Sequence, residues 1–288
     1  MPSPLFPGLT DCHMHVFGPI DRYPGAPDRT YTPEQMGLAE YAPIAAKLDV
    51  ERIVIVQPSA YGTDNRSTLD GLKALGEKGR AVVVIDDHFS AETLADFDRQ
   101  GVRGIRLNLM TPRITDASAA EATLLRAAER IAGLGWHIQI YADLDLVALL
   151  APAVRKSAVP VVFDHMGGAK ADAGADVPGF GVLVDLLKEG KCWVKLSGAD
   201  IVTWQNSDFS GATPFACALI AANPRQLVWG SDWPHLVHHH SGRGDDAPPA
   251  GYRPVIEEKL AEALAGWAGS KATLRAILVD NPVRLYSF

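Results

Sequence analysis

The chain has 288 residues, of which 47% are hydrophobic and 21% are charged, and it carries a formal net charge of −7 and three cysteines. This composition excludes a disordered chain and a disulfide-stabilised scaffold, and the acidic balance disfavours a nucleic-acid-binding protein, which is usually basic over its contact face. No apolar run approaches the ~18 residues of a membrane-spanning helix, the amino-terminal segment lacks a signal-peptide pattern, and so few cysteines favour a reducing compartment, so we expect a cytoplasmic protein without a membrane partner.

Short runs of apolar and β-branched residues alternate along the chain with segments whose apolar residues are three and four positions apart. The first pattern predicts strands that are buried on both faces, and the second predicts helices. In chain order we expect strand 9–15, helix 40–48, strand 52–57, helix 67–78, strand 81–86, helix 91–100, strand 104–109, helix 117–134, strand 137–142, helix 144–158, strand 160–164, helix 182–189, strand 192–197, helix 213–222, strand 226–230, and finally helices 254–267 and 270–288.

Eight strands that alternate with helices predict a parallel sheet with crossover helices, and the length is close to the ~250 residues of a (β/α)8 TIM barrel. The alternative is an open doubly wound sheet, which usually has a glycine-rich phosphate loop after its first strand. This chain has Asp11-Cys12-His13-Met14-His15 there. No linker or low-complexity segment divides the sequence. We therefore predict a single α/β barrel domain over residues 1–288, with the two last helices as a carboxyl-terminal helical extension.

Polar side chains collect where the predicted strands end, and in a barrel the chemistry lies at these carboxyl ends. His13 and His15 close the first strand, His165 follows the sixth and Asp232 follows the eighth, so these four are candidate catalytic residues. Arg106, near the end of the fourth strand, offers a planar fork suited to a carboxylate. Further candidate substrate-binding residues at or after strand ends are Tyr141, Ser59, Arg113 and Lys195.

Each of these residues alone has an ordinary structural explanation. A buried histidine usually satisfies a core hydrogen bond, and an aspartate after a strand often caps the next helix. Their joint occurrence at the ends of different strands favours an active site. By contrast, the run of histidines at 238–240 lies in the loop after the eighth strand, where such a run more often marks a surface than a dedicated metal site.

Four motifs extend the pattern over nearly the whole chain, from about Leu9 to Tyr286. They are Asp11-X-His13-X-His15, Asp164-His165-Met166-Gly167, Gly230-Ser231-Asp232-Trp233-Pro234-His235 and Asn281-Pro282-X-X-Leu285-Tyr286. These motifs resemble the amidohydrolase superfamily, and within it the branch that contains 2-pyrone-4,6-dicarboxylate lactonases and related sugar-lactone enzymes. The resemblance implies a distorted (β/α)8 barrel with the active site at its mouth, and a hydrolase that opens lactones of aromatic or sugar acids.

The resemblance also raises the question of a metal. Many relatives hold a divalent ion with the strand-one histidines, a strand-five histidine and the strand-eight aspartate, but this chain has Tyr141 at the strand-five position and no bridging lysine on strand four. The lactonase branch resembles this chain in having that tyrosine and works without metal, so we favour a site without a cofactor. A single zinc ion stays open, because His13, His15, His165 and Asp232 would supply an acceptable shell.

Without metal, we expect Asp232 to act as general base on a water that attacks the lactone carbonyl. The three histidines would donate hydrogen bonds to the carbonyl oxygen as it gains charge, and Arg106 would hold a carboxylate, so the expected partner is a small anionic lactone. In the pattern of the dicarboxylate lactonases, arginines stand at the positions of Gly168 and Ile201, and Lys170 is the residue that would replace one of these charges. A monocarboxylated lactone of the muconolactone or aldonolactone type therefore fits this chain as well as the aromatic dicarboxylate.

Three other functions stay open from the sequence. The first is a metal-dependent amidohydrolase or decarboxylase, which metal analysis and chelation would reveal. The second is a lactone isomerase, which needs the same acid and base but no water, so the product mass distinguishes it from a hydrolase. The third is a barrel that binds a carboxylated ligand without turnover. The oligomeric state is not fixed by the sequence, and a homo-oligomer stays open.

Overall fold

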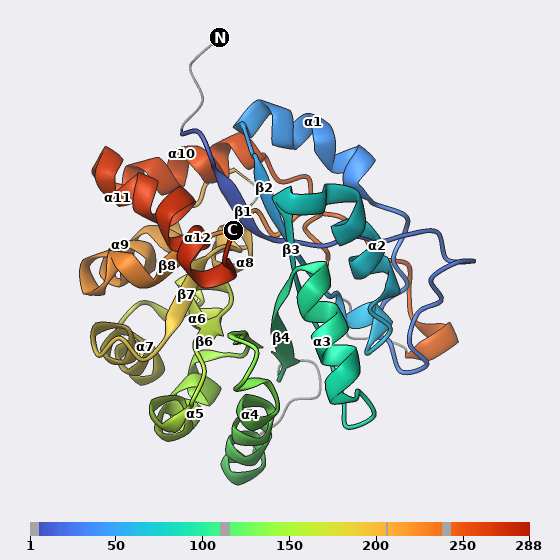
Figure 1. Ribbon diagram of the computed structural model, residues 1–288. Helices are drawn as coiled ribbons and strands as arrows, with labels where there is room; N and C mark the ends of the chain where they lie inside the picture. The colour runs from blue at the N-terminus through green and yellow to red at the C-terminus, as the bar shows by residue number, and fades with distance from the viewer. Residues whose placement is uncertain (1–5, 110–115, 206, 238–242) are drawn as a thin grey trace.

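The computed structural model describes residues 6–109, 116–205, 207–237 and 243–288. Eight parallel strands follow one another in chain order around one sheet, and the end of β1 pairs with the segment after β8 through Met14 and Trp233, which closes the ring. Helices surround this ring (Figure 1). The predicted (β/α)8 barrel with a carboxyl-terminal helical extension is confirmed.

The strands are β1 (Thr10–Met14), β2 (Arg52–Val56), β3 (Gly79–Val83), β4 (Val102–Asn108), β5 (His137–Tyr141), β6 (Val161–Phe163), β7 (Trp193–Leu196) and β8 (Leu227–Trp229). The helices are α1 (Leu38–Leu48), α2 (Arg66–Leu75), α3 (Ala91–Gln100), α4 (Ala117–Ile131), α5 (Leu144–Lys156), α6 (His165–Gly168), α7 (Pro178–Lys188), α8 (Ala199–Thr203), α9 (Thr213–Ala222), α10 (Glu257–Ala268), α11 (Lys271–Arg275) and α12 (Asn281–Tyr286). All eight predicted strands are present, most with ends within two residues of the expected ones.

The last predicted helix, 270–288, is confirmed as continuous helical backbone over residues 271–286, although its hydrogen-bond pattern changes in the middle. It is divided into α11, a π-helical turn over Ala276–Asp280, and α12. Pro282 is the reason, because it lacks an N–H and its ring clashes with the carbonyl four residues before it, so the regular ladder cannot pass through this point. The short helices α6 and α8, which follow β6 and β7, were not expected from the sequence.

Two apolar layers hold the barrel together. Inward-facing residues such as Cys12, Val54 and Val228 fill its interior, and outward-facing residues such as Val83, Ile138 and Val194 pack against the surrounding helices. Every one of these side chains is fully buried. This alternation along each strand is what a barrel requires, and the polar groups of the candidate site collect at the strand ends.

The carboxyl-terminal segment closes the amino end of the barrel, where α12 lies in front of the strands in Figure 1. The Tyr286 ring lies 5.2 Å from the ring of His137, the first residue of β5, and the Arg80 guanidinium on β3 donates to the Tyr286 carbonyl. His137 therefore belongs to the end of the barrel opposite the carboxyl ends of the strands. No helix in the described part of the chain combines the length and the apolar character needed to cross a membrane.

Candidate active site

Asp11 connects the end of β1 to the segment after β8. One of its carboxylate oxygens accepts hydrogen bonds from the backbone N–H groups of His13 (3.0 Å) and Ser231 (2.9 Å), and the other accepts from the Tyr41 hydroxyl. The Asp232 N–H donates to the His13 carbonyl at 2.8 Å. These bonds fix the two chain segments against each other, so the side chains of His13 and Asp232 are held in one relative position.

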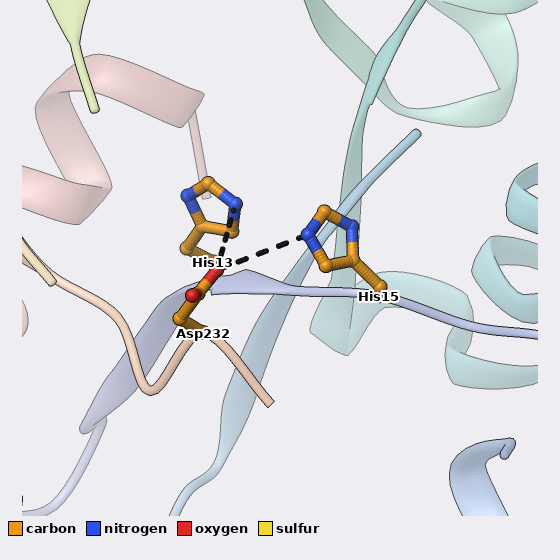
Figure 2. A group of neighbouring side chains, drawn as sticks. All are labelled: His13, His15 and Asp232. Carbon is orange, nitrogen blue, oxygen red and sulfur yellow. Dashed lines mark ion pairs between the residues drawn. The ribbon is translucent and has the colours of Figure 1, made fainter. Parts of the chain in front are cut away.

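Three imidazoles converge on one carboxylate oxygen at the mouth of the barrel. Asp232 Oδ1 lies 3.4 Å from His13 Nε2, 3.8 Å from His15 Nε2 and 3.6 Å from His165 Nε2. Figure 2 shows His13, His15 and Asp232 pointing toward one another. The four residues that the sequence predicts as catalytic are therefore brought together by the fold.

The backbone at this site adopts conformations that most residues avoid. Asp232 has φ of 65° and His165 has φ of 50°, both in the left-handed region, where strain is commonly found at functional sites. Gly198, with φ of 63°, lies against the His165 ring, and a Cβ there would be 2.7 Å from His165 Nδ1. A glycine is needed at this position because any side chain would displace the ring.

The Nδ1 atoms of His15 and His165, which point away from Asp232, have different hydrogen-bond partners. His15 Nδ1 lies 2.8 Å from the Val56 carbonyl, which only accepts, so Nδ1 carries a proton and Nε2 of the neutral ring presents a lone pair to Asp232. His165 Nδ1 bonds to the Ser197 hydroxyl at 2.9 Å. Because the His15 lone pair and the Asp232 carboxylate both accept, a water molecule or a cation that contacts both fits between them.

Burial favours the neutral forms of the three histidines and of Asp232. Removal from water lowers the pKa of His15 to about 3 and lowers the pKa of His13 and His165 well below the ordinary value. Burial also raises the pKa of Asp232 well above the ordinary value, with nearby Asp200 adding to the effect. The imidazoles are therefore neutral hydrogen-bonding groups at neutral pH, and Asp232 is the group of the cluster that titrates above its usual range.

This shift predicts the pH dependence of turnover. A general base must be deprotonated, so a raised pKa means that activity is lost, as the pH falls, at a higher pH than an ordinary aspartate would give. We expect the acid limb of kcat/KM to have its midpoint above about 3.9, the value of an unperturbed aspartate. A limb at or below that value in a pH profile would contradict the assignment of Asp232 as the buried base.

A pocket that is partly open to solvent lies over this cluster. Arg106, Ser59 and Tyr141, three of the residues predicted to bind substrate, line it, and the Arg106 guanidinium lies over the Tyr141 ring at 5.6 Å. Burial raises the pKa of Tyr141 to about 12, so this phenol keeps its proton and can donate to a ligand. Three further residues of the lining were missed by sequence reasoning: Tyr31, Asn108 and Leu236.

The missed residues differ in whether the sequence contained a signal for them. Asn108 ends β4 two positions after Arg106, so the two-residue period of a strand places both on the same side. Tyr31 lies in the long connection between β1 and α1, and Leu236 lies in the loop after β8. No local pattern marks either residue, because only the course of the loop brings it to the pocket.

Comparison with known proteins identifies the family. A family model described as amidohydrolase matches residues 10–288. The chain belongs to the amidohydrolase family. It is 32% identical over 280 residues to a 4-sulfomuconolactone hydrolase of Hydrogenophaga intermedia, covering 97% of this chain and 89% of the relative.

Two other relatives of this amidohydrolase cover similar lengths. It is 31% identical over 288 residues to a 2-pyrone-4,6-dicarboxylate hydrolase of Comamonas testosteroni, covering 97% of this chain and 90% of that one. It is 27% identical over 289 residues to a D-galactarolactone isomerase of Agrobacterium fabrum, covering 99% and 93%. The family predicted from the four sequence motifs is confirmed.

Lys195 is the predicted substrate-binding residue that the structure moves away from the pocket. It lies on β7, its side chain is fully buried below the pocket, and it does not contribute to the lining. The fold places it beneath the cluster, and its contact with substrate stays a prediction. Arg113 and the histidines at 238–240 lie outside the described residues.

The donor set of this amidohydrolase fits one divalent ion. Tetrahedral zinc with bonds of about 2.0–2.1 Å places its ligands about 3.4 Å apart. His13 Nε2 and His15 Nε2 lie 3.4 and 3.8 Å from Asp232 Oδ1, and the three atoms lie within 4.8 Å of one another. His13 Nε2 is buried and has no hydrogen-bond partner among the described residues. The site is thus compatible with a single metal, the alternative that the sequence left open.

Neither position that carries an arginine in the lactonase pattern offers a cation in this structure. Gly168 has φ of 76°, and a Cβ there would lie 2.3 Å from the Ala142 carbonyl oxygen, so its backbone excludes a side chain. Ile201 is buried in α8. Lys170 directs its ammonium to the ring of Trp204, 5.2 Å from the ring centre. Arg106 is the one cationic side chain in the pocket lining of the described chain.

Proposed function

We propose that this amidohydrolase hydrolyses a small lactone that carries an anionic group. The observation that carries the proposal is the convergence of His13, His15 and His165 on Asp232 at the floor of a pocket whose wall contains Arg106. The arrangement joins a buried base, neutral hydrogen-bonding groups and one cation. The names of two relatives, a sulfomuconolactone hydrolase and a pyrone-dicarboxylate hydrolase, support the same reaction class.

The chemistry follows from the roles of these groups. Asp232 takes a proton from water as the water oxygen bonds to the lactone carbonyl carbon. His13 and His165 are buried and face the developing negative oxygen, where fixed dipoles stabilise charge efficiently. The bond between the carbonyl carbon and the ring oxygen then breaks, and the proton held by Asp232 passes to that oxygen. The product is a hydroxy acid that contains every atom of the lactone and of one water.

A bound divalent ion would be held by His13, His15 and Asp232 and would supply Lewis-acid polarisation of the carbonyl. The roles of the wall residues are the same with or without it. Arg106 binds and orients the anionic group, and the hydroxyl groups of Ser59 and Tyr141 offer hydrogen bonds to the rest of the substrate.

The substrate we propose carries a single anionic group beside the lactone ring. One guanidinium in the described pocket wall pairs with one carboxylate or sulfonate, and the backbone at Gly168 excludes the second clamp. A monocarboxylated or sulfonated muconolactone, or an aldonolactone with one carboxylate, therefore suits the pocket better than an aromatic dicarboxylate.

Turnover in 18O-labelled water tests hydrolysis directly. We expect the purified enzyme, with a panel of anionic lactones, to give products heavier by one labelled water. A lactone isomerase, the activity that the D-galactarolactone isomerase relative names, would give a product of unchanged mass without label. An unlabelled isomeric product would therefore show that the enzyme is an isomerase and not a hydrolase. Binding without any product would exclude both activities.

A further inference from the structure

Lys195 lies directly beneath the histidine cluster and is enclosed by acceptors. Its side chain is fully buried. The ammonium nitrogen lies 2.9 Å from the Cys12 carbonyl oxygen and 2.6 Å from Gln139 Oε1. Both partners can only accept, so they take two of its hydrogens and fix the direction of the third.

The third hydrogen is directed at His13 and Asp164. Lys195 Nζ lies 3.4 Å from His13 Nδ1 and 3.6 Å from Asp164 Oδ1. Asp164 is itself fully buried, with Gln139 donating to its other oxygen at 2.9 Å and Arg106 Nε 3.7 Å away. A buried carboxylate needs opposite charge beside it, and Lys195 supplies that charge only as an ammonium.

This arrangement determines which nitrogen of His13 carries the proton. An ammonium has no lone pair, so His13 Nδ1 accepts from Lys195 and the proton of the neutral ring lies on Nε2. Asp164 Oδ1 is only 3.4 Å from His13 Nδ1, yet it has no hydrogen-bond partner among the described residues, so the ring does not donate to it. His15 has the opposite tautomer, because its Nδ1 donates to the Val56 carbonyl.

We propose that Lys195 is a positioning residue that keeps His13 as a donor at Nε2 and thereby weakens metal binding at this site. A metal ligand needs a lone pair on the coordinating nitrogen, and a ligating histidine usually donates its other N–H to an acceptor behind it. His15 meets this requirement. His13 meets it only after its proton moves to Nδ1 and toward Asp164, which the Lys195 ammonium opposes. The catalytic part of this inference rests on the proposed lactone hydrolysis, in which His13 donates to the carbonyl oxygen.

Replacement of Lys195 by methionine tests the proposal, because methionine has similar length and no charge. In K195M, Asp164 Oδ1 becomes the natural partner of His13 Nδ1, so the ring is expected to change tautomer. The 15N chemical shifts of labelled histidine report this change, with the His13 signal assigned by its loss in H13Q. We expect zinc affinity to rise on the order of 10-fold or more, the scale of effects from residues behind metal ligands. We also expect kcat to fall while KM stays within about threefold, because Arg106 and the pocket wall are unchanged.

Two controls separate this effect from a general loss of stability or from zinc bound elsewhere. H137Q changes another buried polar residue of the barrel, at the opposite end, and should leave the His13 tautomer, zinc affinity and kcat unchanged. A zinc titration of D232N measures the zinc that binds to histidines outside this site, and this amount is subtracted from the zinc bound by the wild type and by K195M.

The proposal is overturned if wild-type His13 carries its proton on Nδ1, which the spectrum of the unmodified enzyme decides even if K195M does not fold. It is also overturned if folded K195M binds zinc no more tightly than the wild type. Neither measurement uses a lactone, so a failure of the proposed lactonase activity leaves both results interpretable.

Discussion

Replacing Asp232 by asparagine is expected to lower kcat by about 10²- to 10⁴-fold, the range that a positioned general base contributes. Asparagine has the same shape but cannot accept the proton of water. The substitution also removes the negative charge that faces three imidazoles, since Asp232 Oδ1 lies 3.4 to 3.8 Å from their Nε2 atoms. The measurement is steady-state turnover of an anionic lactone, with circular dichroism and thermal unfolding to confirm the fold.

The matched control for D232N is D96N, which also converts an aspartate to an asparagine. Asp96 lies on α3, is half exposed and pairs with Arg99 one helical turn away. A surface pair of this kind contributes little to stability, so D96N should keep wild-type activity. Full activity in D232N would exclude Asp232 as the base, whereas an equal loss in D96N would indicate that the assay reports stability.

Replacing Arg106 by methionine is expected to raise KM by about 10²-fold for a lactone that carries a carboxylate. Loss of a charge-assisted contact costs about 1.5–3 kcal/mol, which corresponds to roughly a 10- to 150-fold change in binding. Arg106 is the one cation in the pocket lining of the described chain, so no neighbour there replaces it. For the uncharged methyl ester of the same lactone, we expect KM to change less than about fivefold.

The comparison of the charged and uncharged substrates is the internal control, because both use the same Asp232 and histidines. Arg106 also donates to the Gln57 carbonyl at 3.2 Å, so R106K provides a second variant that keeps the charge. Lysine lacks the planar fork and should recover only part of the affinity. An equal rise of KM for both substrates would show that Arg106 maintains the structure of the site and does not recognise the anionic group.

The fold of this chain can be predicted from its sequence because the patterns that indicate its strands and helices are local. Each strand is a short β-branched run, and each helix has apolar residues at a spacing of three and four, so neither requires knowledge of distant residues. The boundary errors arose where a distant or covalent constraint acts. Pro282 interrupts the regular hydrogen-bond ladder of the last helix, and the pairing of Gly79 with Ile53 on β2 sets the start of β3 at Gly79 instead of Ala81.

Part of the candidate site can be predicted from the sequence for the same reason. The carboxyl ends of parallel strands meet at one face, so His13, His15, His165 and Asp232 were expected together as soon as their strands were placed. No local sequence pattern indicates how deep within the barrel a side chain lies. Lys195 is the penultimate residue of β7 and Tyr141 is the last residue of β5, yet Lys195 is enclosed beneath the cluster and Tyr141 lines the pocket.

The sequence by itself determined the barrel, the family motifs and the types of chemical group at the strand ends, since these follow from local periodicity and composition. The tertiary structure alone decided which nitrogen of His13 and of His15 is available. That choice depends on partners far away in the chain, such as Lys195 for His13 and the Val56 carbonyl for His15, which lie 182 and 41 positions from the rings they hold. A hydrogen bond is directional and short-ranged, so its presence is settled only when the folded chain brings donor and acceptor together.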